Sequence, residues 1–280
     1  MSQPAQQARE ALGQRLREIR QNAGHTGRRL ASLAGWHYTK VSKLENAVTS
    51  PSEADIHAWC SHCSAEEQIP ELIATIRNID GMYVEWRRRL SDGLKQVQES
   101  SFSLYEQNLR FRIYEASIIP GLLQNANYIA ATLQIADNFY NSSSDVDAAV
   151  ATRVERQRFL YQGDRRFLFL VEESALRTVL GSREVLLGQL DRLLAVMNLP
   201  RVSLGVIPAQ TPRELWPGES FLIFDEHTVR IETTSAHLTI TQPREIALYV
   251  KAFSWLERSA LYGDQARVLI REIMAEIAAT

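Results

Sequence analysis

Residues 26–46 read TGRRLASLAGWHYTKVSKLEN, and this stretch decides how the first part of the chain folds. The hydroxyl of Thr26 can accept a hydrogen bond from a free backbone N–H, which is typical of the start of a helix. Leu30, Ala31 and Ala34 then fall on one helical face. Gly35 predicts the end of this helix, because glycine readily takes the left-handed backbone conformation of a tight turn.

A second helix is expected from about Tyr38, with Val41 and Leu44 on its inner side because they are three residues apart. Its outer side is polar and cationic, with Tyr38, Thr39, Lys40, Ser42 and Lys43. Two helices joined by a turn this short are typical of a helix-turn-helix, whose second helix enters the major groove of DNA. The alternative is an ordinary helical hairpin with a solvated charged face.

The distribution of charge favours the DNA-binding interpretation. Between Ala8 and Asn46 there are eight basic and three acidic residues, a net charge of +5, whereas the whole chain carries −2. The remainder of the chain therefore carries −7. A basic segment attached to an acidic body is typical of a protein that contacts nucleic acid at one end.

The stretch from about Ala8 to Ser64 resembles a phage-repressor-type (Xre-like) helix-turn-helix domain. The segments that carry the resemblance are LGQRLREIRQNAG (12–24), LASLAGW (30–36) and KVSKLEN (40–46). The resemblance implies a further packing helix near residues 52–60. By position it implies that three residues face bases, namely Tyr38, Thr39 and Lys43. Four others lie nearer the DNA backbone, namely Thr26, Arg28, Lys40 and Asn46. Ser42 also points outward from the second helix and is a further candidate DNA contact.

The same resemblance assigns Arg20 and Glu45 to a buried ion pair that holds the first helix to the recognition helix. Arg20 is therefore expected to have a structural role, although a count of charges alone would make it a DNA contact. The sequence departs from many relatives at two positions. Ala47 stands where glycine often ends the recognition helix, and Gly27 stands where a glutamine often contacts phosphate.

Four potential metal ligands lie within seven residues: His57, Cys60, His62 and Cys63. Residues three apart on a helix can share a face, so a zinc site is one interpretation. The other is that DIHAWCSHCS forms the last packing helix, in which cysteine acts as a small apolar residue. We favour the second interpretation and expect no metal.

Length and composition limit the remaining possibilities. A chain of 280 residues with 45% hydrophobic content can hold two domains, each with a buried core. No run approaches the roughly 20 apolar residues of a membrane span, and the first ten residues lack a signal-peptide core. Two cysteines suggest no disulfide framework. We therefore expect a cytoplasmic protein that does not associate with membranes.

We expect three regions: a helix-turn-helix domain of about five helices (1–65), a helical connector (66–100) and an α+β domain (101–280). In the connector, apolar residues recur at threes and fours from Leu72 to Leu90, and three arginines lie in the WRRRL segment. These arginines could touch DNA, but a solvated helical face is the favoured interpretation.

The larger domain is expected to hold a small, mostly antiparallel sheet covered by helices. Residues 103–116 and 120–140 have helical patterns, and Phe167–Val171 is apolar throughout, which indicates a strand buried on both faces. Short β-rich segments at 201–208, 220–224, 228–233 and 238–241 are expected to form a meander. Two helices, at 242–261 and 262–279, close the chain.

No motif of this domain indicates catalysis, since GxGxxG, GxxxxGK[ST], HExxH and GxSxG are all missing. His227 and His237 could meet across a hairpin, and Glu172 and Glu173 end the buried strand. Surface turns and helix capping are the favoured roles of these residues. We therefore expect no enzyme and no cofactor.

Residues from about Tyr105 to Ile277 resemble the domain that follows a helix-turn-helix in WhiJ-like actinobacterial regulators. Segments IIPGLLQNANYIA (118–130), ATRVERQRFL (151–160) and YVKAFSWLERSALYGDQARVLI (249–270) carry this resemblance. It implies an antitoxin-like or developmental transcription regulator, often encoded beside a small acidic partner protein.

Two functions follow. The first is a homodimeric regulator that binds double-stranded DNA at an inverted-repeat operator and whose larger domain senses a ligand or partner. The second is an antitoxin-like interaction module that binds a small acidic partner and autoregulates its operon. The sequence leaves both open, because a sensor pocket and a partner groove can use the same apolar residues.

Overall fold

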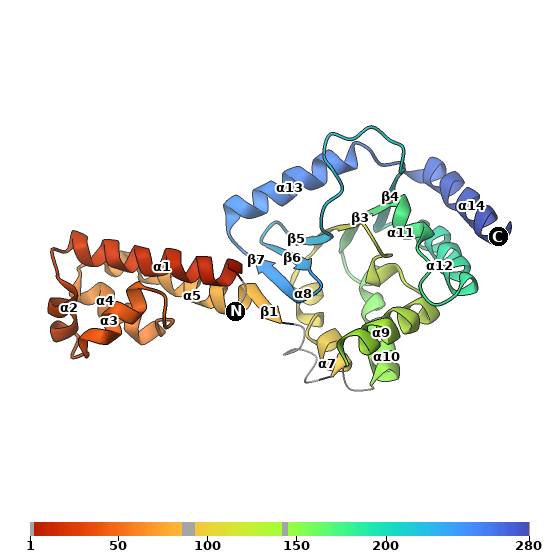
Figure 1. The fold of residues 1–280 in the computed structure, drawn as a ribbon. Coiled ribbons are helices and arrows are strands. Elements are labelled where there is room, and N and C mark those ends of the chain that lie inside the picture. The colour runs from red at the N-terminus through yellow and green to blue at the C-terminus, as the bar shows by residue number, and fades with distance from the viewer. Residues whose placement is uncertain (1–2, 86–92, 142–144, 280) are drawn as a thin grey trace. The chain divides into compact units, whose positions relative to one another are not determined.

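The chain folds as two units, divided between Val84 and Glu85, in a computed structural model that describes residues 3–85, 93–141 and 145–279. Figure 1 shows the elements of both units in chain order. The dividing point lies inside the segment 66–100 that the sequence places between the two domains. Each unit has its own hydrophobic core.

The described part of the first unit contains five α-helices, four of them within the predicted domain 1–65 and the fifth in the segment predicted as a connector. They are α1 (Gln3–Asn22), α2 (Gly27–Leu33), α3 (Tyr38–Glu45), α4 (Glu53–His62) and α5 (Ile69–Met82), with a 3-10 turn at Glu66–Gln68. Their inner faces meet around Trp59, which is fully buried and donates from its indole nitrogen to the Leu16 carbonyl at 3.1 Å.

The ends of these helices follow from local chemistry. Thr26 caps α2, and its hydroxyl accepts from the Arg29 N–H at 3.2 Å. Gly35 has a φ of 67°, as the turn requires. Ser52 and Asp55 form a capping box at the start of α4.

The helical connector expected over 66–100 is interrupted by a short strand. Helix α5 packs into the first core through Leu72 and Ile76, and the chain then forms a short strand, β1 (Tyr83–Glu85). Gly93, with a φ of 92°, precedes α7 (Leu94–Glu99) in the second unit. The WRRRL segment lies outside the described residues. Whether Arg87, Arg88 and Arg89 face solvent or contact DNA therefore stays a prediction.

The second unit combines helices with a mixed sheet. Its described α-helices after α7 are α8 (Phe102–Gln107), α9 (Ala126–Tyr140), α10 (Val146–Arg156), α11 (Glu173–Arg177), α12 (Arg183–Val196), α13 (Pro243–Glu257) and α14 (Gly263–Ala279). Its strands are β2 (Arg110–Glu115), β3 (Arg166–Glu172), β4 (Val202–Ile207), β5 (Phe221–Phe224), β6 (Thr228–Glu232) and β7 (Ala236–Ile240).

These strands are hydrogen-bonded in the order β7-β6-β5-β2-β3-β4. Strands β5, β6 and β7 form the expected antiparallel meander, and β5 pairs antiparallel with β2. Strand β4, which we expected in the meander, instead pairs parallel with β3 at the far edge. The cause is the intervening helix α12, because a helical crossover returns the chain in the same direction. The sheet is therefore mostly, but not wholly, antiparallel.

The prediction of a helix over 103–116 is wrong in its second half. Residues 110–115 form β2, which lies between β5 and β3. Phe111 and Ile113 face one core, whereas Tyr114 faces the other. This alternation has the period of a strand, and pairing on both sides outweighs local helical preference.

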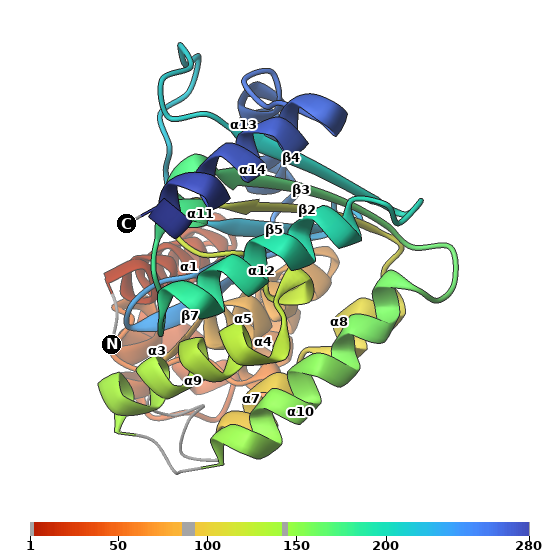
Figure 2. The same ribbon diagram turned by 90° about the vertical axis from the view of Figure 1, so that its right-hand side faces the viewer.

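Helices cover both faces of the sheet. One core packs α9, α12 and α14 against Phe111, Phe169 and Val206, and Figure 2 shows α12 and α14 beside β2, β3 and β4. The other core packs α13 against Leu170 and Phe221. Strand β3 is thus buried on both faces, as its continuous apolar sequence predicts.

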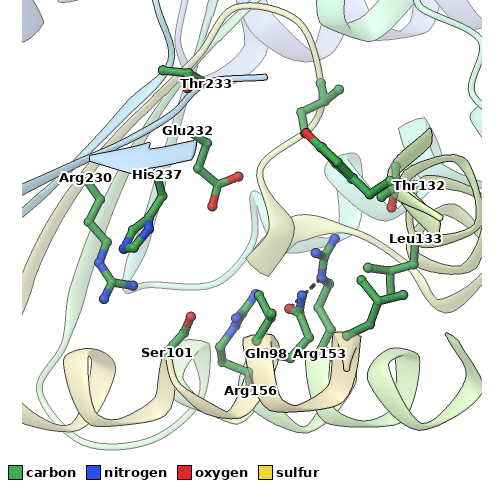
Figure 3. Close-up of a pocket in the computed structure, with 15 residues that line it drawn as sticks. Gln98, Ser101, Thr132, Leu133, Arg153, Arg156, Arg230, Glu232, Thr233 and His237 are labelled. Carbon is green, nitrogen blue, oxygen red and sulfur yellow. Dashed lines mark hydrogen bonds between the residues drawn. The ribbon is translucent and has the colours of Figure 1, made fainter. Parts of the chain in front are cut away.

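Helices α7, α9 and α10 form a smaller cluster of their own around Leu94, Ile129 and Leu133. Both carboxylate oxygens of Asp145 accept backbone N–H groups at the start of α7, at 2.9 and 2.8 Å. Between these helices and strands β6 and β7 lies a cavity of about 280 Å³ (Figure 3).

Candidate nucleic-acid interface

The outer face of α3 is the candidate interface. Its inner residues Val41 and Leu44 are 1% and 2% exposed, whereas Tyr38, Thr39 and Lys43 lie on the exposed side. Lys43 makes no hydrogen bond or ion pair with the described residues, so its ammonium is available to an anionic partner. A short exposed helix with hydroxyls and a lysine suits base edges and phosphates.

The start of α3 is organised by a residue that the sequence interpretation missed. His37 is the N-cap, and its ring Nδ1 lies 2.8 Å from the Thr39 hydroxyl and 3.4 Å from the Thr39 backbone nitrogen. The Thr39 side chain is thereby held in one orientation. The position of His37, directly before the helix, is the signal that could have identified it.

Arg28 on α2 approaches the same surface. Its guanidinium carbon lies 5.7 Å from the centre of the Tyr38 ring, which is a cation–π distance, and both side chains are exposed. Thr26 is exposed at the start of α2, and its capping bond holds the first turn of this helix beside the same surface. The structure therefore brings together Thr26, Arg28 and Tyr38 from two helices.

Lys40 lies on the flank of α3 and is engaged by the protein. Its ammonium is 2.6 Å from Asp55 of α4 and 4.5 Å from the centre of the Trp36 ring. Burial alone would raise the pKa of Asp55, but hydrogen bonds from Lys40 and Ser52 outweigh it and hold the pKa below its usual value. Lys40 therefore ties α3 to α4 and is less available to phosphate than Lys43.

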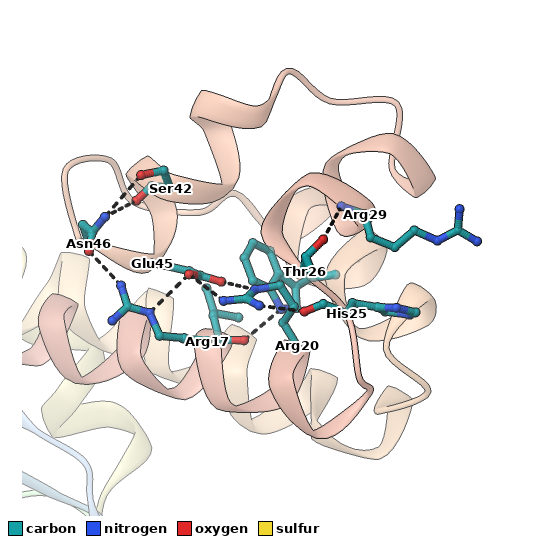
Figure 4. A network of polar contacts seen from close by, with 10 residues as sticks. Arg17, Arg20, His25, Thr26, Arg29, Ser42, Glu45 and Asn46 are labelled. Atoms are coloured by element: carbon teal, nitrogen blue, oxygen red, sulfur yellow. Dashed lines mark hydrogen bonds and ion pairs between the residues drawn. The ribbon is translucent and has the colours of Figure 1, made fainter.

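A buried network anchors α3 to α1 (Figure 4). Arg20 donates to both Glu45 oxygens, at 3.0 Å from Nη2 to Oε2, and to the His25 carbonyl at 2.7 Å. The Arg20 residue is 9% exposed and the Glu45 side chain 8% exposed. The hydrogen bond to Glu45 is the main cause that raises the pKa of Arg20. The structure thus places the predicted Arg20–Glu45 pair between the two helices.

Arg17 is a second cation of this network that the sequence interpretation did not identify. It donates to Glu45 at 3.2 Å and to the Asn46 side-chain oxygen at 2.8 Å. The Asn46 amide nitrogen in turn donates to the Ser42 carbonyl at 2.9 Å. Asn46 and Ser42 therefore close the end of α3, directly beside its exposed face.

The cysteine–histidine segment packs as an apolar element. Cys60 and Cys63 are 0% and 6% exposed, and burial, followed by the charge of Cys63, raises the pKa of the Cys60 thiol to about 11. Metal ligation needs the thiolate, which this burial disfavours. The His25 ring nitrogen lies 3.1 Å from the His62 carbonyl and links the turn after α1 to α4.

Glu172 makes no capping hydrogen bond at the start of α11, contrary to the role we favoured, and has other side-chain partners instead. Glu172 accepts from Arg213 at 2.8 and 2.6 Å and from the Tyr114 hydroxyl at 2.9 Å. It anchors the loop between β4 and β5. In the strand register, His237 lies opposite Glu232, next to the turn of the β6–β7 hairpin. His227 lies just before β6, at the other end of the hairpin, so the two histidines do not meet.

Comparisons with known families agree with the division of the chain into two units. A family described as a helix-turn-helix domain matches residues 11–72. A family described as a domain of unknown function (DUF5753) matches residues 103–272. No curated protein matches the chain at significant similarity. Among the described residues, no helix has the length and apolar character that crossing a membrane requires. Because the second match covers more than half of the chain, the protein belongs to the DUF5753 family, here with a helix-turn-helix domain in front.

Proposed function

We propose that the protein is a sequence-specific transcriptional regulator of the cytoplasm that places α3 in the major groove of DNA. The observation that carries the proposal is the outer face of α3, which is exposed and polar on a helix whose other side is fixed by a buried ion-pair network. Tyr38 and Thr39 contact base edges, since they lie at the start of the recognition helix, and Lys43 contacts base edges from the last turn of the same exposed face. The helix-turn-helix match supports DNA binding itself.

Phosphate contacts come from the flanks of this helix. Arg28 and Thr26 of α2 and Ser42 and Asn46 at the end of α3 lie beside the exposed face. Lys40 acts mainly by positioning, because its ammonium is already paired with Asp55.

The protein acts as a homodimer on an inverted-repeat operator. Dimers of helix-turn-helix proteins present two recognition helices about 34 Å apart, which is one turn of DNA. The second unit supplies the dimer contacts and senses a small ligand. We prefer this function to the antitoxin-like alternative with a small acidic partner, because the second unit holds a cavity lined by charged groups.

The proposal is tested by equilibrium binding of the full chain to its operator and to unrelated DNA of equal length. Lys43→Ala removes a base contact, so operator affinity falls about tenfold or more while affinity for unrelated DNA falls much less. Lys95→Ala changes an exposed lysine of the second unit and serves as the matched control. Equal losses on both DNAs for Lys43→Ala, or a loss for Lys95→Ala as large, would contradict the proposal.

A further inference from the structure

The cavity of the second unit has an apolar end and a cationic end, and both are built by well-defined elements. Helices α7 and α9 supply Leu94, Val97, Leu133 and Ala136 at one end. The other end holds three arginines, with Arg153 and Arg156 from α10 opposite Arg230 from β6 (Figure 3). A side cavity of about 110 Å³ shares all three arginines and extends toward β2.

Arg156 is the most informative of these groups. It is 8% exposed, its Nε atom is buried without a hydrogen-bond partner, and it makes no ion pair with the described residues. Its guanidinium carbon lies 5.6 Å from the centre of the Tyr105 ring. A buried cation without a carboxylate is costly, and an anion bound beside it would offset that cost.

Arg153 is held in place by neutral groups. It donates to Gln98 at 3.0 Å and to Gln124 at 3.1 Å, and these two glutamines are themselves 5% and 0% exposed. Burial, followed by the neighbouring charge of Arg156, lowers the pKa of Arg153 to about 10. The two amides fix its direction, but they are neutral and do not compensate its positive charge.

Two carboxyl groups and one imidazole also face this space. Glu232 lies on β6 near Arg230, Glu115 lines the side cavity, and His237 comes from β7. Burial raises the pKa of Glu115 to about 8, so this carboxyl is mostly neutral at pH 7. Glu232 then supplies one negative charge against three guanidinium groups. The cavity has an excess of positive charge.

The volume limits what can enter. A cavity of about 150 Å³ binds benzene, so a cavity of about 280 Å³ can hold a ligand of about ten non-hydrogen atoms. This is at the small end of the range for ligand pockets. The apolar end favours a hydrocarbon or aromatic body over a fully hydrated ion.

We propose that this cavity binds a small organic anion, with a carboxylate or phosphate group between Arg153, Arg156 and Arg230 and an apolar body against α7 and α9. This ligand class applies to the sensor proposed above, and a regulatory role of the ligand rests on that proposed function. Anion binding can be measured without DNA, so anion binding and DNA binding can fail separately.

The test is calorimetric titration of the full chain, without DNA, with sodium octanoate, phenyl phosphate, inorganic phosphate and octylamine hydrochloride. At least one of the two organic anions binds, and it binds more tightly than inorganic phosphate or the octylammonium cation. Which of the two binds distinguishes a carboxylate from a phosphate ligand. Arg156→Gln weakens that binding about tenfold or more, whereas Arg271→Gln, at an exposed position of α14, leaves it unchanged.

Ala136→Phe fills the apolar end and provides a second variant, which decides the question if Arg156→Gln does not fold. It abolishes binding of the organic anion. The inference is overturned if neither organic anion binds, if octylammonium or inorganic phosphate binds as tightly, or if a folded variant at residue 156 or 136 binds like the parent. In the absence of ligand, the same variants bind the operator with the affinity of the parent. This control separates a loss of anion binding from a loss of DNA binding.

Discussion

Glu45 shows how one buried carboxylate fixes the recognition helix. It accepts hydrogen bonds from Arg17 and Arg20 of α1 while its own backbone ends α3. The two helices are therefore joined by charge as well as by apolar contact. The exposed residues of α3 are held in position, because the inner side of this helix cannot move without separating Glu45 from the two arginines.

Glu45→Ala is expected to lower the free energy of unfolding by about 3 to 5 kcal/mol, because Arg20 would remain buried without its partner. Chemical denaturation of the full chain measures this loss. Replacing both residues, Arg20→Met with Glu45→Leu, recovers most of it, because the one cation that loses its carboxylate, Arg17, is one third exposed and keeps its hydrogen bond to Asn46. Glu18→Gln removes an exposed pair with Arg15 and changes stability by less than about 1 kcal/mol. A small effect of Glu45→Ala, equal to that of Glu18→Gln, would show that the buried pair does not anchor α3.

Glu115 makes the stability of the second unit depend on pH. Burial raises its pKa from 4.5 to about 8, so the folded state holds a proton that the unfolded state releases. The free energy of unfolding therefore falls as pH rises from about 4.5 to 8, by at most about 1.4 kcal/mol per pH unit, and this contribution is constant above that range. Glu115→Gln removes this contribution to the pH dependence. Denaturant unfolding of both proteins at pH 5.5 and 7.5 checks this, and equal pH dependence in the two would refute the assignment.

At the scale of helices and strands, one glycine sets the distance between α1 and α3. A Cβ atom on Gly13 would lie 2.6 Å from the Glu45 carbonyl oxygen and 2.9 Å from that of Leu44. Both are backbone atoms, which cannot move without displacing the recognition helix. The sequence interpretation used Gly13 only as part of a family segment and did not identify this role.

Gly13→Ala is expected to destabilise the first unit by about 1 to 3 kcal/mol through overpacking, despite the higher helix propensity of alanine. It also weakens operator binding, because α3 must shift. Gly188→Ala is the matched control within a helix of the second unit, where the added Cβ would lie 3.6 Å from the Asn125 amide nitrogen. The control is neutral or stabilising by up to about 1 kcal/mol. Thermal unfolding compares the two, and a harmless Gly13→Ala would contradict the proposed close approach.

The elements that the sequence predicts well are those with local signals. Thr26 caps α2 through a side-chain hydrogen bond, and Gly35 lies in the turn after this helix with a φ of 67°. Strand β2 and the edge position of β4 were not predicted, because pairing partners far along the chain determine them. A helical pattern at 103–116 cannot reveal that Arg110–Glu115 will lie between two strands.

At the scale of the whole molecule, the two candidate sites differ in how far the sequence predicts them. The helix-turn-helix is one continuous segment, so its spacing indicates the motif, whereas the engagement of Lys40 by Asp55 required the fold. The cavity draws on α7, α9, α10, β6 and β7, and no spacing relates Arg156 to Arg230. The sequence interpretation therefore did not identify its arginines.

Ligand binding and DNA binding are expected to influence each other if the second unit is a sensor. An organic anion that binds the cavity changes operator affinity by about five-fold or more in either direction, a typical size for coupling between sites. Arg156→Gln removes this effect without changing affinity in the absence of ligand. Fluorescence anisotropy with labelled operator measures the coupling. An anion that binds tightly but leaves operator affinity unchanged would make the cavity a binding site without a regulatory role.

The central claim, that the outer face of α3 reads a DNA sequence, is tested most directly by selecting bound duplexes from a random pool with the parent chain and with Tyr38, Thr39 and Lys43 all changed to alanine. The account predicts that the parent enriches an inverted repeat with half-site centres about one helical turn apart. The triple variant is folded and loses this enrichment. A parent chain that enriches no sequence, or a folded triple variant that enriches the same one, would contradict the claim.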